Sequence, residues 1–270
     1  MNEIDATRLR ARLVGPYAAV DVVASTGSTN ADLREAAVRD APDRSVLIAG
    51  EQTAGVGRRA RVWSSPPGTG IYLSVLLRPR GVGFAELGSL SLVAGLAVLD
   101  LTDALGVDAA LKWPNDVLAG PDRGKCAGIL AEALSAEELA VVLGIGLNVR
   151  PLGQDVQPAA GGLAPTSLEE NGANTTDRTE IAALLLSAFA ERESRWRRAG
   201  GNLARAGLLD EYRVRCETVG KQVKVLLPGD SSMTGVAADV DDDGQLVVAT
   251  PDGRRHSVFA GDVVHLRTVG

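Results

Sequence analysis

Cysteine and histidine are scarce in this chain of 270 residues, which has two of each. Cys126 and Cys216 are too few for a disulfide scaffold and lack the spacing of metal ligands. His256 and His265 likewise provide little material for a zinc site or a Ser-His-Asp triad. The composition therefore argues against all three kinds of site.

The chain also lacks the charged-then-apolar N-terminal pattern of a signal peptide, and any uncharged apolar run long enough to span a bilayer. The longest candidate, residues 90–101, is interrupted by Asp100. The formal net charge of -6 argues against a general nucleic-acid binder, because such proteins carry an excess of Lys and Arg that faces phosphates. We therefore expect a soluble, cytoplasmic protein that binds neither membranes nor nucleic acids.

Aromatic residues make up only 3% of the chain, so each tryptophan is informative. Trp63 lies in the most unusual stretch, "GEQTAGVGRRARVWSS", which we call the arginine loop (residues 50–65). Its glycines allow backbone N–H groups to approach an anion, and arginine donors match phosphate or carboxylate. The spacing of a phosphate-binding P-loop is absent, however. By itself, the stretch is better explained as an exposed turn.

The order of apolar runs and turn residues predicts an α+β fold. Long paired strands are expected at 125–134 and 139–149, and residues 151–178 form a long loop rich in Pro, Gly, Asn and Thr. The remaining strands are predicted at 18–24, 45–50, 70–77 and 112–119, the last with a turn at Pro114-Asn115, and helices at 31–41, 86–105 and 202–215. A further helix, after residue 178, should keep one apolar face, formed by Ile181, Leu184, Leu185, Ala188 and Trp196.

The texture of the sequence changes after Cys216. Five short β-type segments follow, separated by Gly and Asp turns at the spacing of a small barrel. We therefore expect two domains, a catalytic domain over residues 1–216 and a barrel over residues 217–270.

Two further motifs are ambiguous when taken singly. "KWPND" (112–116) fits a turn capped by its own Asn and Asp side chains at least as well as a site at a strand end. Lys125, at the start of the apolar run "KCAGIL", is usually explained as a solvated strand-end lysine. No single motif decides the function.

Taken together, the motifs do. In order and spacing, "STN", "EQTAGVGRRARVW", "LKWPNDVL", "GKCAGILAE" and "VLGIGLNV" resemble the biotin protein ligases, and "PTSL" (165–168) and the terminal "GDVVHL" extend the resemblance. It implies a catalytic domain related to class II aminoacyl-tRNA synthetases, with a mixed β-sheet and flanking helices, and a C-terminal SH3-like barrel. It also implies that biotin reacts with ATP and Mg²⁺ to give biotinyl-5'-AMP. Biotin then passes to a lysine of the biotin carboxyl carrier domain of an acyl-CoA carboxylase.

The resemblance assigns roles residue by residue. Lys125 and Arg58 would stabilise charge at the reacting carboxyl and phosphate, and Asp116 would orient or deprotonate the carrier lysine. Lys112 would give electrostatic or structural support. The resemblance assigns no residue as a certain metal ligand. The Mg²⁺ ion would be held by the phosphates of ATP, near Asn148. The biotin-binding residues would be Ser28, Thr29, Asn30, Gln52, Trp63, Lys125 and Gly128, and the adenylate-binding residues Arg58, Arg61, Asn115, Lys125 and Asn148.

The arginine loop departs from the usual family pattern GRGRxGRxW at two positions, where Val56 replaces an arginine and Ala60 a glycine. Loss of one charge-assisted contact should weaken adenylate retention by about 1.5–3 kcal/mol. A positive φ at Ala60 would further penalise closure of the loop. Only about seventeen residues precede the first predicted strand, too few for a winged helix-turn-helix, so we expect a form that is a ligase only.

Two other functions remain open at this stage. A lipoate or octanoyl transferase of the same superfamily would activate or transfer lipoate and not biotin. A non-catalytic biotin sensor would bind ligand without releasing pyrophosphate, and Val56 is its best support.

Overall fold

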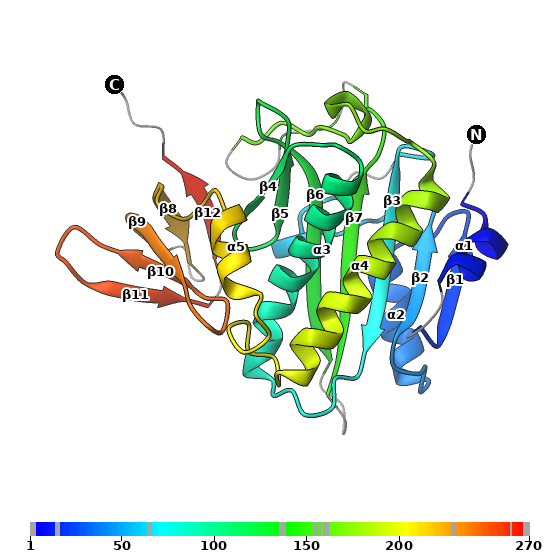
Figure 1. Cartoon of the computed structure of the whole chain (residues 1–270), viewed down its shortest axis with the longest axis horizontal. Helices are drawn as coiled ribbons and strands as arrows, with labels where there is room; N and C mark the ends of the chain where they lie inside the picture. Colours follow the sequence, from blue (N-terminus) through cyan, green and yellow to red (C-terminus); the bar gives the residue numbers. More distant parts are fainter. Residues whose placement is uncertain are drawn as a thin grey trace.

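The computed structural model describes residues 4–13, 17–63, 66–134, 139–153, 156, 158, 162–227, 231–259 and 261–266. In these segments the chain forms a seven-stranded sheet, ordered β1-β2-β3-β7-β6-β5-β4, and a five-stranded sheet, ordered β11-β10-β9-β8-β12. The two sheets lie at opposite sides of the molecule along its long axis (Figure 1). The α+β architecture expected from the sequence is confirmed.

The large sheet is mixed, because β1 pairs with β2 in parallel and all other neighbours are antiparallel. Six of its strands fall where the apolar runs predict them, whereas β4 (Ala109–Lys112) ends at Lys112, where the segment 112–119 is expected to begin as a strand. Strand β3 is buried along its whole length, which explains why its sequence shows no polar alternation. The strands are β1 (Ala19–Val23), β2 (Ser45–Ala49), β3 (Gly70–Leu77), β4 (Ala109–Lys112), β5 (Asp116–Ala119), β6 (Gly124–Leu134) and β7 (Ala140–Asn148).

Helices cover both faces of this sheet, with α3 and α4 on one face and α2 on the other (Figure 1). The segment Ala85–Ala104, which contains α3, is long and apolar enough to cross a membrane, but 72% of its apolar window is buried inside the fold. It is therefore a core helix, and its Asp100 pairs with Arg192 of α4. The helices and short turns are α1 (Ala6–Arg12), α2 (Thr29–Val38), η1 (Arg58–Ala60), η2 (Ala85–Ser89), α3 (Leu90–Ala104), η3 (Glu169–Asn171), α4 (Arg178–Arg198) and α5 (Leu209–Arg215).

Two helical predictions are wrong in part. The helix expected over 202–215 is confined to α5, because residues 203–207 form turns that end at Gly207, with a φ of 66°. Leu184 does not belong to the buried face of α4, since it is 37% exposed, and Phe189 takes part in that face instead. In the predicted loop 151–178, the described residues are irregular apart from η3 and Arg178, which begins α4. The other residues of that loop lie outside the described segments.

The small sheet packs against the turn between β4 and β5. The indole Nε1 of Trp113 donates to the carbonyl of Gly244 at 2.9 Å, and the Trp113 amide donates to Thr218 Oγ1 at 3.1 Å. Trp113 is 1% exposed, so both bonds are shielded from water and fix the "KWPND" turn against the C-terminal region. The strands of this sheet are β8 (Gln222–Leu226), β9 (Ser232–Val240), β10 (Leu246–Ala249), β11 (Arg255–Val258) and β12 (Asp262–His265).

Candidate active site

A cavity of about 540 Å³ opens between the arginine loop, the central strands β6 and β7, the "KWPND" turn and the start of β12. Every site residue expected from the sequence lines it, although these residues come from segments far apart along the chain. These are Ser28, Thr29, Asn30, Gln52, Arg58, Arg61, Trp63, Asn115, Asp116, Lys125, Gly128 and Asn148.

Glycines on β6 and β7 form part of the cavity wall. Gly128 and Gly146 are cross-strand partners, and the ring of Trp63 lies against both. A Cβ atom would stand 2.8 Å from this ring at Gly128 and 2.5 Å from it at Gly146. Gly144 makes similar room for the amide of Asn30. Larger residues on these strands would therefore displace Trp63 or Asn30.

One end of the cavity is polar but uncharged. Gln52 Oε1 accepts from the Thr29 amide at 2.9 Å and from Thr29 Oγ1 at 3.1 Å. Ser28 caps α2, so Ser28 and Thr29 both lie at the start of this helix. Ser74, a buried residue of β3 missed in the sequence, contacts Thr29 Oγ1 at 2.7 Å. A serine within an apolar strand gives little signal by itself.

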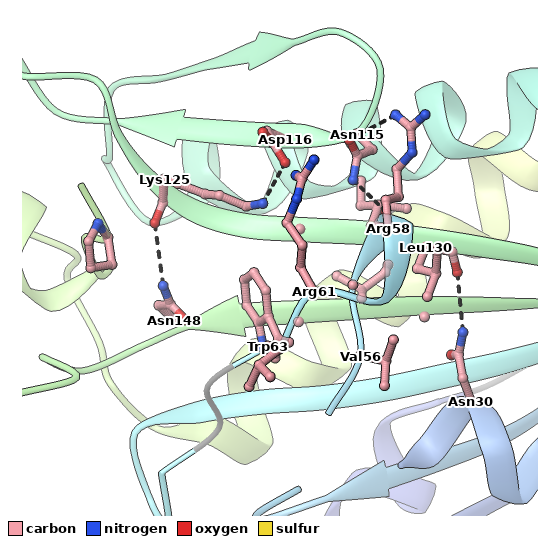
Figure 2. A pocket seen from close by; sticks show the side chains of 18 of the residues that line it. Asn30, Val56, Arg58, Arg61, Trp63, Asn115, Asp116, Lys125, Leu130 and Asn148 are labelled. Atoms are coloured by element: carbon pink, nitrogen blue, oxygen red, sulfur yellow. Dashed lines mark hydrogen bonds and ion pairs between the residues drawn. The ribbon is translucent and has the colours of Figure 1, made fainter. Parts of the chain in front are cut away.

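Asn30 anchors this end to β6. Its Nδ2 donates to the Leu130 carbonyl at 3.4 Å (Figure 2) and to Glu132 Oε2 at 2.6 Å. Its Oδ1 accepts from Ser74 at 2.6 Å. The amide is thus engaged on both sides within the protein. The geometry favours a positioning role that holds the start of α2 against the sheet.

The other end of the cavity is charged. Lys125 Nζ lies 2.6 Å from Asp116 Oδ1 and 5.3 Å from the centroid of the Trp63 ring (Figure 2). Lys112 Nζ lies 3.7 Å from the second carboxylate oxygen of Asp116, and its burial lowers the pKa of that lysine. One carboxylate therefore lies between two ammonium groups, one of which reaches over the aromatic ring.

Two asparagines hold the surrounding backbone. Asn115 Nδ2 donates to the carbonyl of Ile129 at 2.8 Å, and its Oδ1 accepts from Arg58 at 3.4 Å. Burial lowers the pKa of Arg58. Asn148 Nδ2 donates to the carbonyl of Thr166 at 3.0 Å. Among the described residues, the buried Asn148 Oδ1 has no hydrogen-bond partner, so it remains available to a ligand.

The described part of the arginine loop is a short hairpin. Trp63 donates its amide to the Gly55 carbonyl at 2.9 Å, Val56 pairs with Val62, and Gly57 donates to the Arg61 carbonyl at 2.8 Å. At the tip, the Arg61 amide donates to the Arg58 carbonyl at 3.3 Å.

The two residues at the hairpin tip have left-handed backbones, with a φ of 56° at Arg59 and 58° at Ala60. Positive φ at both central positions is the requirement of a type I′ turn, for which glycine or asparagine is preferred. The structure thus places Ala60 at positive φ, the case anticipated from the sequence.

A carboxylate from the C-terminal region also enters the cavity. Asp262, the first residue of β12, pairs through Oδ2 with Arg61 and, at 3.4 Å, with Arg59. It lies in the "GDVVHL" segment of the family resemblance, but the resemblance assigns it no role in the site. Within the described segments, no group of three or more His, Cys, Asp and Glu residues has the arrangement of a metal site.

Comparison with known proteins agrees with this architecture. Residues 22–148 match the model of the biotin/lipoate A/B protein ligase family, and residues 218–266 match that of the biotin protein ligase C-terminal domain. The biotin–[acetyl-CoA-carboxylase] ligase of Mycobacterium tuberculosis is 45% identical, over 98% of this chain and 96% of its own length. The corresponding ligase of Paracoccus denitrificans is 35% identical, over 87% of this chain and 95% of its own length.

A solved structure is similar as well. The biotin protein ligase of Aquifex aeolicus, in complex with biotin and ATP, has a TM-score of 0.74 and 26% sequence identity, and the match covers 93% of this chain and all of the other. The resemblance seen in the sequence motifs is therefore confirmed across both sheets, including the SH3-like C-terminal region. This chain belongs to the biotin protein ligase family.

Proposed function

We propose that this protein is a biotin–[biotin carboxyl-carrier protein] ligase, which activates biotin with MgATP and transfers it to a lysine of the carrier domain of an acyl-CoA carboxylase. The observation that carries the proposal is the cavity itself. Its uncharged end suits a small polar ring, and its other end brings Lys125, Arg58 and Arg61 to one place, where a carboxylate and a phosphate could meet. We also propose that the protein acts in the cytoplasm, where MgATP is supplied.

At the uncharged end, Ser28, Thr29 and Gln52 present the hydrogen-bonding groups for the ureido ring of biotin. Buried donors and acceptors of this kind reject analogues that lack the matching groups. Trp63 and Gly128 form the apolar surface along the ring and the valeryl chain, and Asn30 holds the helix start in position.

In the first step, a carboxylate oxygen of biotin attacks the α-phosphorus of ATP. The bond between the α-phosphorus and the bridging oxygen breaks, and pyrophosphate leaves with that oxygen. Lys125, Arg58 and Arg61 lower the energy of this step by neutralising the charge that develops on the phosphate oxygens. Asn115 and Asn148 shape the adenylate side of the cavity.

Magnesium enters with ATP as part of the substrate. A Mg²⁺ ion carried on phosphates needs few protein ligands, and the unpartnered Oδ1 of Asn148 has the oxygen chemistry that this ion prefers.

In the second step, the amine of the carrier lysine attacks the acyl carbon of biotinyl-5'-AMP. The bond from that carbon to the phosphate oxygen breaks, AMP leaves, and the amine loses a proton as the amide forms. Asp116 orients the amine or accepts its proton, while Lys112 stays beside Asp116 and Lys125 stabilises the oxyanion.

We also propose that the catalytic domain comprises residues 1–216 and the barrel residues 217–270.

The test is incubation of the full chain with biotin, MgATP and an apo-carrier domain, with lipoate in place of biotin as a parallel reaction. We expect labelling of the carrier with biotin and release of pyrophosphate. Activation of lipoate alone would establish the transferase alternative. Binding of biotin without pyrophosphate release would establish the sensor alternative.

A further inference from the structure

The carboxylate of Asp262 joins the C-terminal region to the arginine loop. Asp262 is 6% exposed and lines the cavity, and within the described segments it shares this position with only one other acidic residue, Asp116. Arg59 and Arg61 both pair with it, and Arg59 also donates to the Leu227 carbonyl at 3.5 Å. Arg59 and Arg61, the two residues that flank Ala60, therefore attach the tip of the hairpin to the C-terminal region.

The two cavity carboxylates have different cationic partners. Asp116 lies between Lys112 and Lys125, on the strands of the large sheet. Asp262 holds the arginines of the loop, whose side chains are 42% and 43% exposed. Asp262 thus fixes the wall of the cavity that is formed by the hairpin of the arginine loop.

We propose that Asp262 is a positioning residue, which holds the arginine loop over biotinyl-5'-AMP once pyrophosphate has left. The inference rests on the proposed function. The triphosphate of ATP offers several negative charges to the loop arginines, whereas the adenylate keeps a single phosphate charge. Arg58 and Lys125 lie deeper in the cavity and can neutralise that charge. Asp262 then supplies the anion that Arg59 and Arg61 would otherwise lack.

The composition of the loop makes such an attachment necessary. Val56 lines the cavity and is 51% exposed, so position 56 contributes no charge to hold an anionic ligand. The tip also carries two residues with positive φ, a conformation that L-residues adopt only against a steric penalty. Attachment of the residues on either side of Ala60 to Asp262 offsets that penalty.

The decisive variant is Asp262→Asn, which keeps the size of the side chain and removes its charge. In a single turnover without carrier, we expect biotinyl-5'-AMP to leave the enzyme about five- to twentyfold faster, as for loss of a charge-assisted hydrogen bond in a partly exposed site. Biotin-dependent exchange of pyrophosphate into ATP should persist without a rise in the KM for ATP, because Arg61 is then free to face phosphate. A merely structural role would instead weaken ATP binding and folding together.

Four further variants complete the design. Asp262→Glu keeps the charge and should keep most of the retention, whereas Asp252→Asn, on the exposed turn of the same sheet, should change nothing. Val56→Arg added to Asp262→Asn should restore retention by supplying a charge from another position. If Asp262→Asn does not fold, Arg59→Ala serves instead, and it should speed release in the same direction.

The outcomes separate the two levels of inference. Absence of biotin-dependent pyrophosphate exchange in the unmodified protein would overturn the proposed function. Normal exchange together with an unchanged release rate in Asp262→Asn, or in Arg59→Ala where the first variant does not fold, would overturn the role of Asp262 and leave the ligase activity in place.

Discussion

Replacement of Ala60 by glycine should slow the escape of biotinyl-5'-AMP from the active site. Ala60 has a φ of 58° at the second central position of the hairpin tip, where its Cβ meets the steric conflict of a left-handed backbone. Glycine adopts the same conformation without this conflict. The substitution therefore stabilises the closed hairpin and changes no contact to the ligand.

The size of the effect follows from two opposing terms. A left-handed conformation costs an L-residue about 1–2 kcal/mol. Glycine removes that penalty but gives the open loop more conformational freedom, which costs about 0.5–1 kcal/mol. The net gain of about 0.5–1 kcal/mol for the closed loop corresponds to a release rate lowered by about two- to fivefold.

The measurement is a single turnover with labelled biotin and MgATP, in which free and enzyme-bound biotinyl-5'-AMP are separated over time. Ala54→Gly is the matched control, since Ala54 lies in the same loop without a positive φ. It should leave the release rate unchanged or raise it. Equal slowing in both variants, or no slowing in Ala60→Gly, would refute the argument from backbone strain.

Four other substitutions test different parts of the structure. Lys125→Ala should lower carrier labelling by at least a hundredfold, because a charge at the reacting centre is lost. The control Lys224→Ala, on the exposed face of β8, should not lower it. Undiminished labelling in Lys125→Ala would remove that lysine from the mechanism. Val56→Arg in the unmodified background should slow adenylate release about tenfold, and an unchanged rate would show that position 56 makes no contact. Gly146→Ala should weaken biotin binding, measured by calorimetry, by tenfold or more, because its Cβ would stand 2.5 Å from the Trp63 ring; unaltered affinity would mean that the ring has room to move. Glu193→Ala should lower the free energy of unfolding in urea by about 3 kcal/mol, since Arg44 loses its carboxylate partner and Arg197, among the described residues, keeps only Asp43. A loss below about 1 kcal/mol would count against a buried ion network.

The central strands could be predicted from the sequence because their burial leaves a direct signal. Residues 70–77 form an apolar run whose only polar side chains are Ser74 and the hydroxyl of Tyr72, and β3 covers the same residues. The helix expected at 202–215 fails where tertiary contacts prevail. The amide of Leu203 donates to the Asp242 carbonyl at 3.1 Å, and Gly207 turns the chain with a positive φ before α5 begins.

The site divides in the same way. Motif order brings Lys125, Asn115 and Trp63 into one expected site, and the structure places all three around one cavity. Asp262 could not be found this way, since it lies 201 residues from Arg61 in the chain and 203 from Arg59. A contact over such a separation depends on the packing of the small sheet, which no local pattern records.

The glycines along β6 and β7 also limit how this active site can change. Substitution at Gly128, Gly144 or Gly146 can only add atoms, so at these three positions the wall of the cavity can move inward but not outward. Variants that accept bulkier acids must therefore arise elsewhere, at the larger strand residues such as Leu130 and Ile145, or in the hairpin and at the start of β12. Selection for a bulkier substrate would leave the three glycines in place and act on the side chains around them.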